Sequence, residues 1–200
     1  MIEYKFIIFV AVAYFLGNIS PSTIQAKKRG VDIKSEGSGN AGTTNTFRVL
    51  GAKPAIITLV VDILKGVVAV LLGLYFSGKA AMFCALFVFL GHVYPIIYKF
   101  KGGKGIATAF GATMAIDWRI GLILLSIVAV MFIFTKTVSI SALVAVVAYP
   151  LICYMIKPEF VYISFAMALI ALFKHRGNIH RILKGEEKKV CEFSSERKVK

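Results

Sequence analysis

The sequence predicts an all-α membrane helix bundle, and three observations support this fold class. First, 58% of the 200 residues are hydrophobic, whereas soluble domains usually contain roughly 45–50%. Second, the apolar residues form long runs that suit membrane-spanning helices. Third, the Lys and Arg residues behind the net charge of +14 cluster between those runs, as membrane topology requires. The positive charge therefore indicates loops at a membrane surface, and no nucleic-acid partner is expected.

Seven apolar runs predict seven transmembrane helices, some of them short or broken compared with the ~20 residues of a straight span. The runs cover residues 4–24, 54–77, 80–98, 104–117, 119–135, 138–156 and 159–174. The first run resembles a signal peptide, but Gly17–Ser20 after its apolar part contains no small-residue cleavage site, so we expect a retained span. The run at 104–117 is the shortest, and a re-entrant helix is its alternative.

The charged loops predict one orientation for these spans. Basic residues concentrate in 25–53, in 99–104 and after residue 173. Seven crossings place all three segments in the cytoplasm and the N-terminus outside, whereas a re-entrant fourth helix would separate the tail from the other two and break the positive-inside rule. We therefore expect a single integral membrane domain over 1–187, followed by a basic cytoplasmic tail over 188–200.

The segment Glu36–Arg48 is glycine-rich and polar in a chain otherwise built for lipid. It reads EGSGNAGTTNTFR, with three glycines, several hydroxyl and amide side chains and one arginine. Flexible backbone N–H groups and a guanidinium suit a phosphate-like anion. A solvated linker of small polar residues is the alternative from this run alone. No Lys-Ser or Lys-Thr follows the glycines, so the run is not a nucleotide-binding P-loop.

A second candidate anion site follows the third apolar run. The segment Phe100–Gly105 reads FKGGKG, so Lys101 and Lys104 bracket a glycine pair directly before a predicted helix. Backbone N–H groups, the positive end of the helix and two ammonium groups would then lie together, which suits a phosphate. The alternative is a basic turn that anchors two spans against anionic lipid.

The third candidate segment, Lys174–Arg181, follows the last apolar run. His175 and Asn178 are three residues apart and would share a helix face. A histidine there can act as a base or bind an anion. The alternative is a basic cluster that stops the last span, and we assign His180 to that cluster.

Four polar residues lie in or next to the predicted spans. Asp62 and Lys65 are three apart and can pair on one helix face, so a structural tie and a functional role both remain open for them. His92 is either a ligand-site residue or a hydrogen-bonded packing residue. Ser139 alone is typical of a helix cap.

Motifs of covalent and metal-dependent enzymes are missing from the sequence. It contains no G-x-S-x-G elbow, no His-Glu-x-x-His and no His-x4-Asp pair of the kind used by acyltransferases with soluble active sites. The cysteines Cys84, Cys153 and Cys191 are scattered, with neither metal-ligand nor disulfide spacing. We expect neither a metal ion nor a cofactor.

Together the three segments resemble the motifs of the bacterial acyl-phosphate:glycerol-3-phosphate acyltransferases, the PlsY family. The similar stretches are GSGNAGTTNTFR at 37–48, GHVYP at 91–95 with FKGGKGIAT at 100–108, and HRGNI at 175–179 followed by Arg181, Ile182, Gly185 and Glu187. Asp62-x-x-Lys65-Gly66 and Ser139 also match recurring family positions. Thr43, Tyr94 and Asn18 depart from the residues usual there, and none of the three removes a polar group that the chemistry needs.

The resemblance implies an enzyme of phospholipid synthesis in the bacterial cytoplasmic (inner) membrane. It would transfer an acyl group from acyl phosphate to the 1-hydroxyl of sn-glycerol 3-phosphate, giving lysophosphatidic acid and phosphate without a covalent enzyme intermediate. The implied catalytic residues are Ser38, Arg48, Lys104, His175 and Asn178. The implied substrate-binding residues are Gly39, Asn40, Thr44, Asn45, Lys101, Gly102, Gly103, Gly105, Thr108, Ser139 and Glu187.

Two alternatives from other functional classes stay open. One is a small transporter or channel for an organic anion, although the spans offer few polar groups beside Asp62 and Lys65. The other is a scaffold in a lipid-synthesis complex. The expected partners are the two substrates and membrane lipid, with other lipid-synthesis enzymes as a further class.

Overall fold

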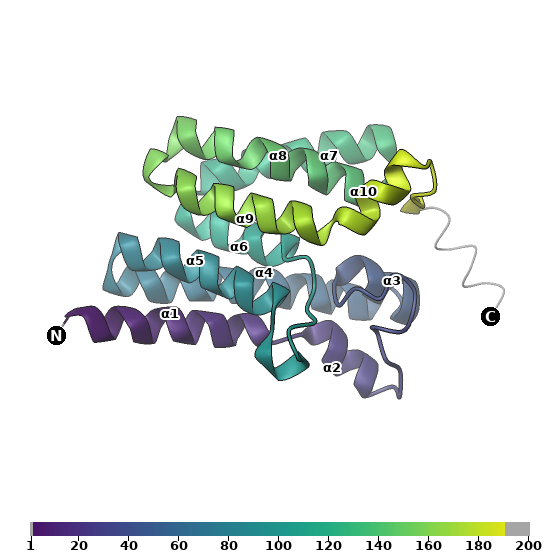
Figure 1. The fold of residues 1–200 in the computed structure, drawn as a ribbon, viewed down its shortest axis with the longest axis horizontal. Helices are drawn as coiled ribbons and strands as arrows, with labels where there is room; N and C mark the ends of the chain where they lie inside the picture. Colours follow the sequence, from purple (N-terminus) through teal and green to yellow (C-terminus); the bar gives the residue numbers. More distant parts are fainter. Residues whose placement is uncertain (1, 191–200) are drawn as a thin grey trace. The chain divides into compact units, whose positions relative to one another are not determined.

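The computed structural model describes residues 2–190, and these form helices and connecting segments without any strand (Figure 1). The helices are α1 (Ile2–Asn18), α2 (Pro21–Lys27), α3 (Thr43–Leu50), α4 (Ala52–Phe76), α5 (Gly78–Val93), η1 (Ile96–Tyr98), α6 (Ile106–Ile116), α7 (Trp118–Thr135), α8 (Val138–Ile156), η2 (Pro158–Phe160), α9 (Val161–Lys174) and α10 (Arg176–Leu183). The predicted all-helical fold is confirmed.

The seven apolar runs all become helical, but they differ in length. Four helical segments are long and apolar enough to cross a membrane: α4, Gly78–Tyr98, α7 and α8. Two bent pairs can each form one broken span, α1 with α2 at 40° and Pro158–Lys174 with α10 at 58°. The seventh run is α6, whose 11 residues extend only ~16 Å along a hydrocarbon core of ~30 Å. Seven is therefore an approximate count.

The chain divides into two compact units, Met1–Trp118 and Arg119–Lys200. The expected single domain over 1–187 stays a prediction.

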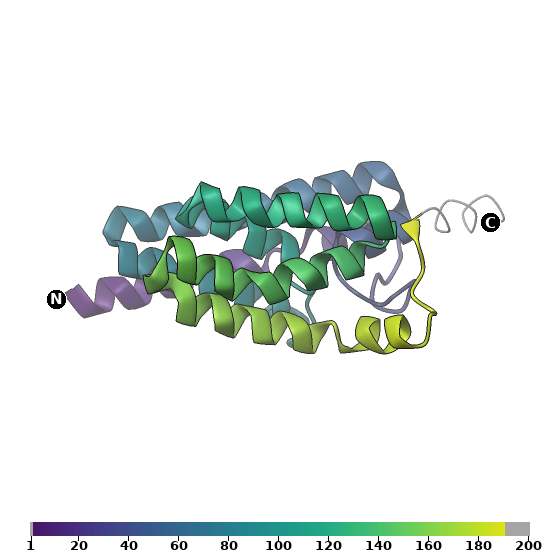
Figure 2. The ribbon, with the colours of Figure 1, turned by 90° about the horizontal axis from the view of Figure 1, so that it is seen from above.

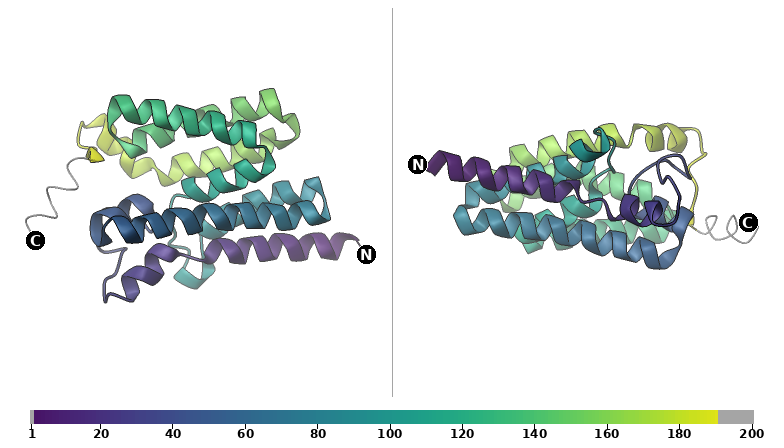
Figure 3. Two further views of the ribbon diagram at one scale, coloured as in Figure 1. Left: turned by 180° about the vertical axis from the view of Figure 1, so that it is seen from behind. Right: turned by 90° about the horizontal axis from the view of Figure 1, so that it is seen from below.

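In the first unit, three segments that carry polar residues lie at one end. The helix α1 runs toward α2 and α3, α4 returns to the opposite end, and α5 leads back into residues 94–105 (Figures 1 and 3). Pro21 begins α2, and the N-cap Ser20 accepts a hydrogen bond from the Thr23 amide at 3.4 Å. We call this end, with α2, α3 and residues 94–105, the loop end.

Glycines allow α4 and α6 of the first unit to approach closely. A Cβ atom added to Gly66 of α4 would lie 2.8 Å from the Ala112 nitrogen of α6, and one added to Gly111 of α6 would lie 3.0 Å from the Cα of Ile63. Close backbone contact at small residues is the usual means of packing helices in lipid. The contact fixes the start of α6, where the second candidate segment ends.

In the second unit, α8 packs against α9, and α9 leads through His175 into α10. The chain after α10 returns to the turn before α8, where the Val190 amide donates to the Lys136 carbonyl at 3.0 Å. Figure 2 shows this return in yellow beyond α10.

Candidate functional site

The glycine-rich segment of the first unit forms a loop, residues 31–42, followed by α3. Gly37 and Gly39 adopt positive φ angles of 60° and 68°, which few residues other than glycine tolerate. Asn45 on α3 holds the loop: its Oδ1 accepts from the Ser38 amide at 2.8 Å, and its Nδ2 donates to the carbonyls of Ile33 and Glu36, both at 3.0 Å. We call this segment the first loop.

The predicted residues of the first loop and of α3 differ in exposure. Ser38 and Gly39 are exposed, Asn40, Thr44 and Arg48 are half-buried, and Asn45 is completely buried. The amide group of Asn45 is thus engaged within the loop, which supports a role in shaping it, and its predicted contact with substrate stays a prediction. The Oγ1 atom of Thr43, at the start of α3, is buried and has no hydrogen-bond partner among the described residues.

The second candidate segment forms a loop over residues 94–105, which we call the second loop. Gly105 precedes α6 with a φ of 81°. The Gly103 amide donates to the His92 carbonyl at 3.2 Å, so the glycine pair folds back on the end of α5. Lys101 is exposed and Lys104 half-buried. The predicted phosphate site at the N-terminus of α6 stays a prediction.

The two loops meet at the loop end of the first unit. The Lys34 Nζ lies 5.0 Å from the centre of the Tyr98 ring, a cation–π contact. A Cβ atom added to Gly103 would lie 2.8 Å from the Ala41 carbonyl oxygen. The first two motifs, about 60 residues apart in sequence, are therefore neighbours in space.

Positive charge accumulates where the loops meet. Partial burial lowers the pKa of Lys34 from its ordinary value; Asp32 raises it, and the charge of Lys101 lowers it further. Like charges held close together favour an anion between them. Sequence reasoning did not include Lys34, because only the folding of the first loop brings it to the second.

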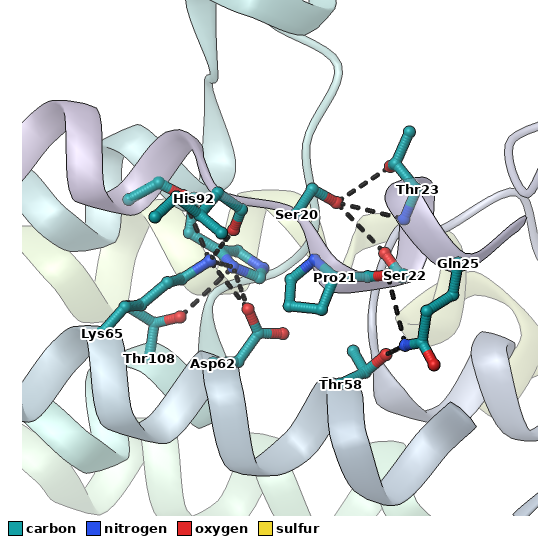
Figure 4. A network of polar contacts seen from close by, with 12 residues as sticks. Ser20, Pro21, Ser22, Thr23, Gln25, Thr58, Asp62, Lys65, His92 and Thr108 are labelled. Atoms are coloured by element: carbon teal, nitrogen blue, oxygen red, sulfur yellow. Dashed lines mark hydrogen bonds and ion pairs between the residues drawn. The ribbon is translucent and has the colours of Figure 1, made fainter. Parts of the chain in front are cut away.

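Beneath the loops, a buried polar network joins α4, α5 and α6 to the end of α1 (Figure 4). Lys65 donates to Asp62 at 2.7 Å and to the carbonyls of Gly17 and Ile19 at 3.1 and 2.6 Å. The Nδ1 atom of His92 lies 2.9 Å from the Lys65 nitrogen and 3.3 Å from the Asp62 carboxylate. Thr108, predicted to bind substrate, is completely buried here and lies 3.2 Å from His92 Nδ1. The hydroxyl of Thr108 thus belongs to this network.

In the second unit, the Glu187 carboxylate receives three hydrogen bonds. Asn178 Nδ2 donates at 2.6 Å, Ser139 Oγ at 2.7 Å and Arg181 Nε at 2.7 Å. Burial raises the pKa of Glu187, but these bonds and the Arg181 charge outweigh it, so the pKa lies below its ordinary value. Ser139 does not cap α8, whose N-cap is Thr137.

His175 lies between α9 and α10 and is 2% exposed. Its Nδ1 lies 2.8 Å from the Ala171 carbonyl oxygen, which can only accept, so Nδ1 carries the proton. In the neutral ring Nε2 is then the basic nitrogen, as the predicted role of a base requires.

Residues 2–190 contain no group of three His, Cys, Asp or Glu side chains that could hold a metal ion. The expectation of a reaction without metal or cofactor stays a prediction.

Comparison with known proteins decides the family. A family profile described as Glycerol-3-phosphate acyltransferase matches residues 7–185. The chain belongs to this family. The predicted resemblance is thereby confirmed.

Individual glycerol-3-phosphate acyltransferases match over nearly the whole chain. The protein of that name from Thermoanaerobacter sp. (strain X514) is 41% identical over 183 residues, which cover 90% of this chain and 92% of the relative. The protein from Clostridioides difficile (strain 630) is 38% identical over 199 residues, with 94% and 96% covered.

Two crystal structures of PlsY, an integral membrane glycerol 3-phosphate acyltransferase, resemble this chain. The glycerol 3-phosphate form has a TM-score of 0.89 and the lysophosphatidic acid form 0.85. Both are 32% identical, and the match covers 92% of this chain and 95% of the other. The chain is thus a multi-pass membrane protein with the PlsY fold.

Besides Lys34, two features of the site were not predicted from the sequence. The helix α3 was not foreseen inside the glycine-rich run, although Thr43–Leu50 contains no glycine or proline and begins after Gly42. The role of Arg181 as a partner of Glu187 was also missed. The acidic residue lies six positions further on, after a turn at Gly185, and nothing in the spacing indicates the contact.

Proposed function

We propose that this chain transfers an acyl group from an acyl phosphate to the 1-hydroxyl of sn-glycerol 3-phosphate, producing lysophosphatidic acid and inorganic phosphate. The observation that carries the proposal is the meeting of two cationic, glycine-rich loops at one end of the first unit. Both substrates carry a phosphate, and each loop offers what a phosphate needs: backbone N–H groups and a Lys or Arg. The glycerol 3-phosphate and lysophosphatidic acid forms of the PlsY relatives support the acceptor and the product.

The reaction requires little from the enzyme beyond binding two anionic substrates in the correct orientation. The substrate hydroxyl oxygen attacks the acyl carbon, the bond from that carbon to the phosphate oxygen breaks, and phosphate leaves with the electron pair. The leaving group is already activated, so no covalent enzyme intermediate is required. Orientation and charge neutralisation are what remain to be supplied.

In the first unit we assign one substrate to each loop. The first loop and α3 hold the acyl phosphate through Ser38, Asn40, Thr44 and Arg48. The second loop binds the glycerol phosphate through Lys101, Lys104 and the backbone of its glycines. The buried, unpartnered hydroxyl of Thr43 supports the first assignment. A buried hydroxyl without a partner costs ~1–3 kcal/mol, and a phosphate oxygen bound there would accept its hydrogen bond.

In the second unit we assign proton transfer to His175. Its Nε2 takes the proton of the attacking hydroxyl, and Asn178 orients that hydroxyl. In the competing route, the acyl phosphate itself takes the proton. If the His175→Ala protein acylates at nearly the wild-type rate, the substrate-assisted route is correct.

We further propose a cytoplasmic site in the bacterial inner membrane, with the N-terminus outside. The concentration of Lys and Arg in 25–53, 99–104 and the tail supports this orientation.

The decisive experiment uses purified full-length protein in detergent with palmitoyl phosphate and glycerol 3-phosphate, and measures phosphate release. Release should require both substrates and fall at least ~100-fold in Arg48→Ala, as expected when a charged group that neutralises the transition state is lost. Lys99→Ala, in the second loop but outside the proposed machinery, is the control and should keep wild-type activity. Absence of release from wild-type protein would refute the function.

A second comparison tests how the loops divide the substrates. Lys104→Ala should raise the KM for glycerol 3-phosphate and leave the KM for palmitoyl phosphate nearly unchanged. The opposite pattern would mean that the loops bind the substrates the other way round.

A further inference from the structure

We infer that Asp62, Lys65 and His92 are positioning residues that fix the second loop against the first loop through the His92 ring. The inference rests on the proposed function for its effect on catalysis, and on the geometry of the first unit for the rest. The three side chains are 2%, 3% and 6% exposed, respectively.

The Lys65 ammonium group has no proton left for a substrate phosphate. It has three protons, and three oxygen acceptors lie 2.6 to 3.1 Å from its nitrogen. Two of them are the carbonyls of Gly17 and Ile19 at the end of α1, where a cation is favoured by the helix dipole. Lys65 is therefore an internal tie between α4 and the end of α1, and any effect on the reaction must pass through its neighbours.

Three polar groups surround the Nδ1 atom of His92. They are the Lys65 ammonium group at 2.9 Å, the Thr108 hydroxyl at 3.2 Å and the Asp62 carboxylate at 3.3 Å. Nδ1 accepts from Lys65 or Thr108 in one tautomer and donates to Asp62 in the other. In both tautomers this edge of the ring is tied to the ion pair, and the Nε2 edge faces away from it.

That edge of the ring lies against the second loop. A Cβ atom added to Gly103 would overlap His92 Nε2 and would lie 3.1 Å from Cδ2. The Gly103 amide also donates to the His92 carbonyl. The loop is thus held by the backbone and the ring of one residue, and Ala41 of the first loop borders Gly103 on another side.

The His92 ring therefore acts as a spacer between the buried ion pair and the second loop. Asp62, Lys65 and Thr108 hold one edge of it, and the other edge supports the glycine pair next to Lys104. If the ring moves, the two loops shift relative to each other, and with them the two proposed phosphates. Misplacement of reacting groups by about 1 Å can cost ~100-fold in rate.

The variant His92→Asn separates positioning from charge compensation. The asparagine amide can accept from Lys65 or donate to Asp62, as Nδ1 can, so the buried ion pair keeps a polar partner, but the far edge of the ring is gone. We expect kcat to fall ~10- to 100-fold, with KM for both substrates within about threefold of wild type, because each loop keeps its own binding groups. Wild-type kcat, or a KM increase of tenfold with unchanged kcat, would overturn the inference.

Amide hydrogen exchange provides a readout that does not depend on activity. Residues 102–105 should exchange at least fivefold faster in His92→Asn than in wild type. If wild-type protein proves inactive but this difference appears, the proposed function fails and the positioning role stands. If wild-type protein is active and the exchange is unchanged, the positioning role fails alone.

A milder pair of variants covers the case in which His92→Asn does not fold. Thr108→Val removes the hydroxyl that holds Nδ1 and should lower kcat a few-fold and speed exchange at 102–105. Thr108→Ser keeps the hydroxyl and should leave exchange at 102–105 at the wild-type rate. Equal kcat and equal exchange in the two variants would overturn the inference.

Discussion

At the scale of single residues, side chains that look alike in the sequence have different tasks. Asn40 and Asn45 stand in the same glycine-rich run, yet Asn40 is half-buried whereas Asn45 is completely buried and bonds three backbone groups of the first loop. Spacing alone could not separate them, because the difference depends on how the loop folds over α3.

Replacing Asn45 by Ala should destabilise the protein by about 2–3 kcal/mol, because one donor and two acceptors of the backbone lose their partner. The midpoint of thermal unfolding in detergent measures the effect. Ser35→Ala, which removes one exposed hydrogen bond to Asp32, is the control and should change stability by less than ~0.5 kcal/mol. Equal midpoints for the two variants would contradict this account of the loop.

Glu187→Gln should release the chain that follows α10. All three partners of the carboxylate donate hydrogen bonds, and an amide nitrogen in place of one oxygen would face donors only. Faster amide exchange of residues 184–190 is the expected result. Glu186→Gln, at the exposed neighbouring position, should leave the exchange unchanged.

The hydrogen bonds to Glu187 predict that the stability of residues 184–190 depends on pH. Because the pKa of Glu187 is lower in the folded protein than its ordinary value of 4.5, its contribution to stability is complete above that value and is lost as the pH falls through the folded pKa. Corrected for intrinsic rates, exchange at 184–190 in wild type should therefore stay constant down to about pH 5 and rise below 4.5. Loss of protection between pH 6 and 8 would exclude this role for the carboxylate.

At the scale of helices, hydrophobicity predicted which segments are helical but not where they break. All seven apolar runs are helical, because a backbone in lipid must satisfy its own hydrogen bonds. The breaks at Ser20 and His175 and the short helix α3 depend on local hydrogen bonds and on contacts distant in sequence. Hydropathy carries no information about either.

Gly111→Ala should be strongly destabilising, by about 2–3 kcal/mol, because its Cβ would overlap the backbone of α4 at Ile63 and neither helix can yield cheaply. The midpoint of thermal unfolding in detergent measures this loss of stability. Gly78→Ala is the matched control: nothing lies within 4 Å of a Cβ at that position, so no loss is expected. A stable Gly111→Ala protein would contradict the close crossing of α4 and α6.

At the scale of the whole molecule, the order of the motifs and the predicted topology were enough to indicate the family. The contacts between the motifs are seen only in the structure. Three motifs in sequence order were enough for the resemblance, which the family profile confirms. That the first two motifs touch at Lys34 with Tyr98, and at Gly103 with Ala41, could not be read from a chain in which they are about 60 residues apart. Charge distribution predicted only that they share a membrane face.

Cysteine labelling tests the proposed orientation. In a Cys191→Ser background, a membrane-impermeant maleimide should label Lys79→Cys in intact cells but Glu36→Cys only after the membrane is opened. Lys79 is in the first turn of α5, and the connection between α4 and α5 lies at the end of the first unit opposite α3 (Figure 1). The reverse labelling pattern would place the loop end outside.

The shortness of α6 leaves much of the length of α4 without a helical partner beside it. In the first unit, α4 spans ~38 Å with 25 residues and α6 only ~16 Å with 11. No residue of α6 is exposed, so its length makes no demand on the thickness of the surrounding lipid. Non-helical chain such as the second loop, with Lys104, can therefore adjoin the start of α6 where protein covers its backbone.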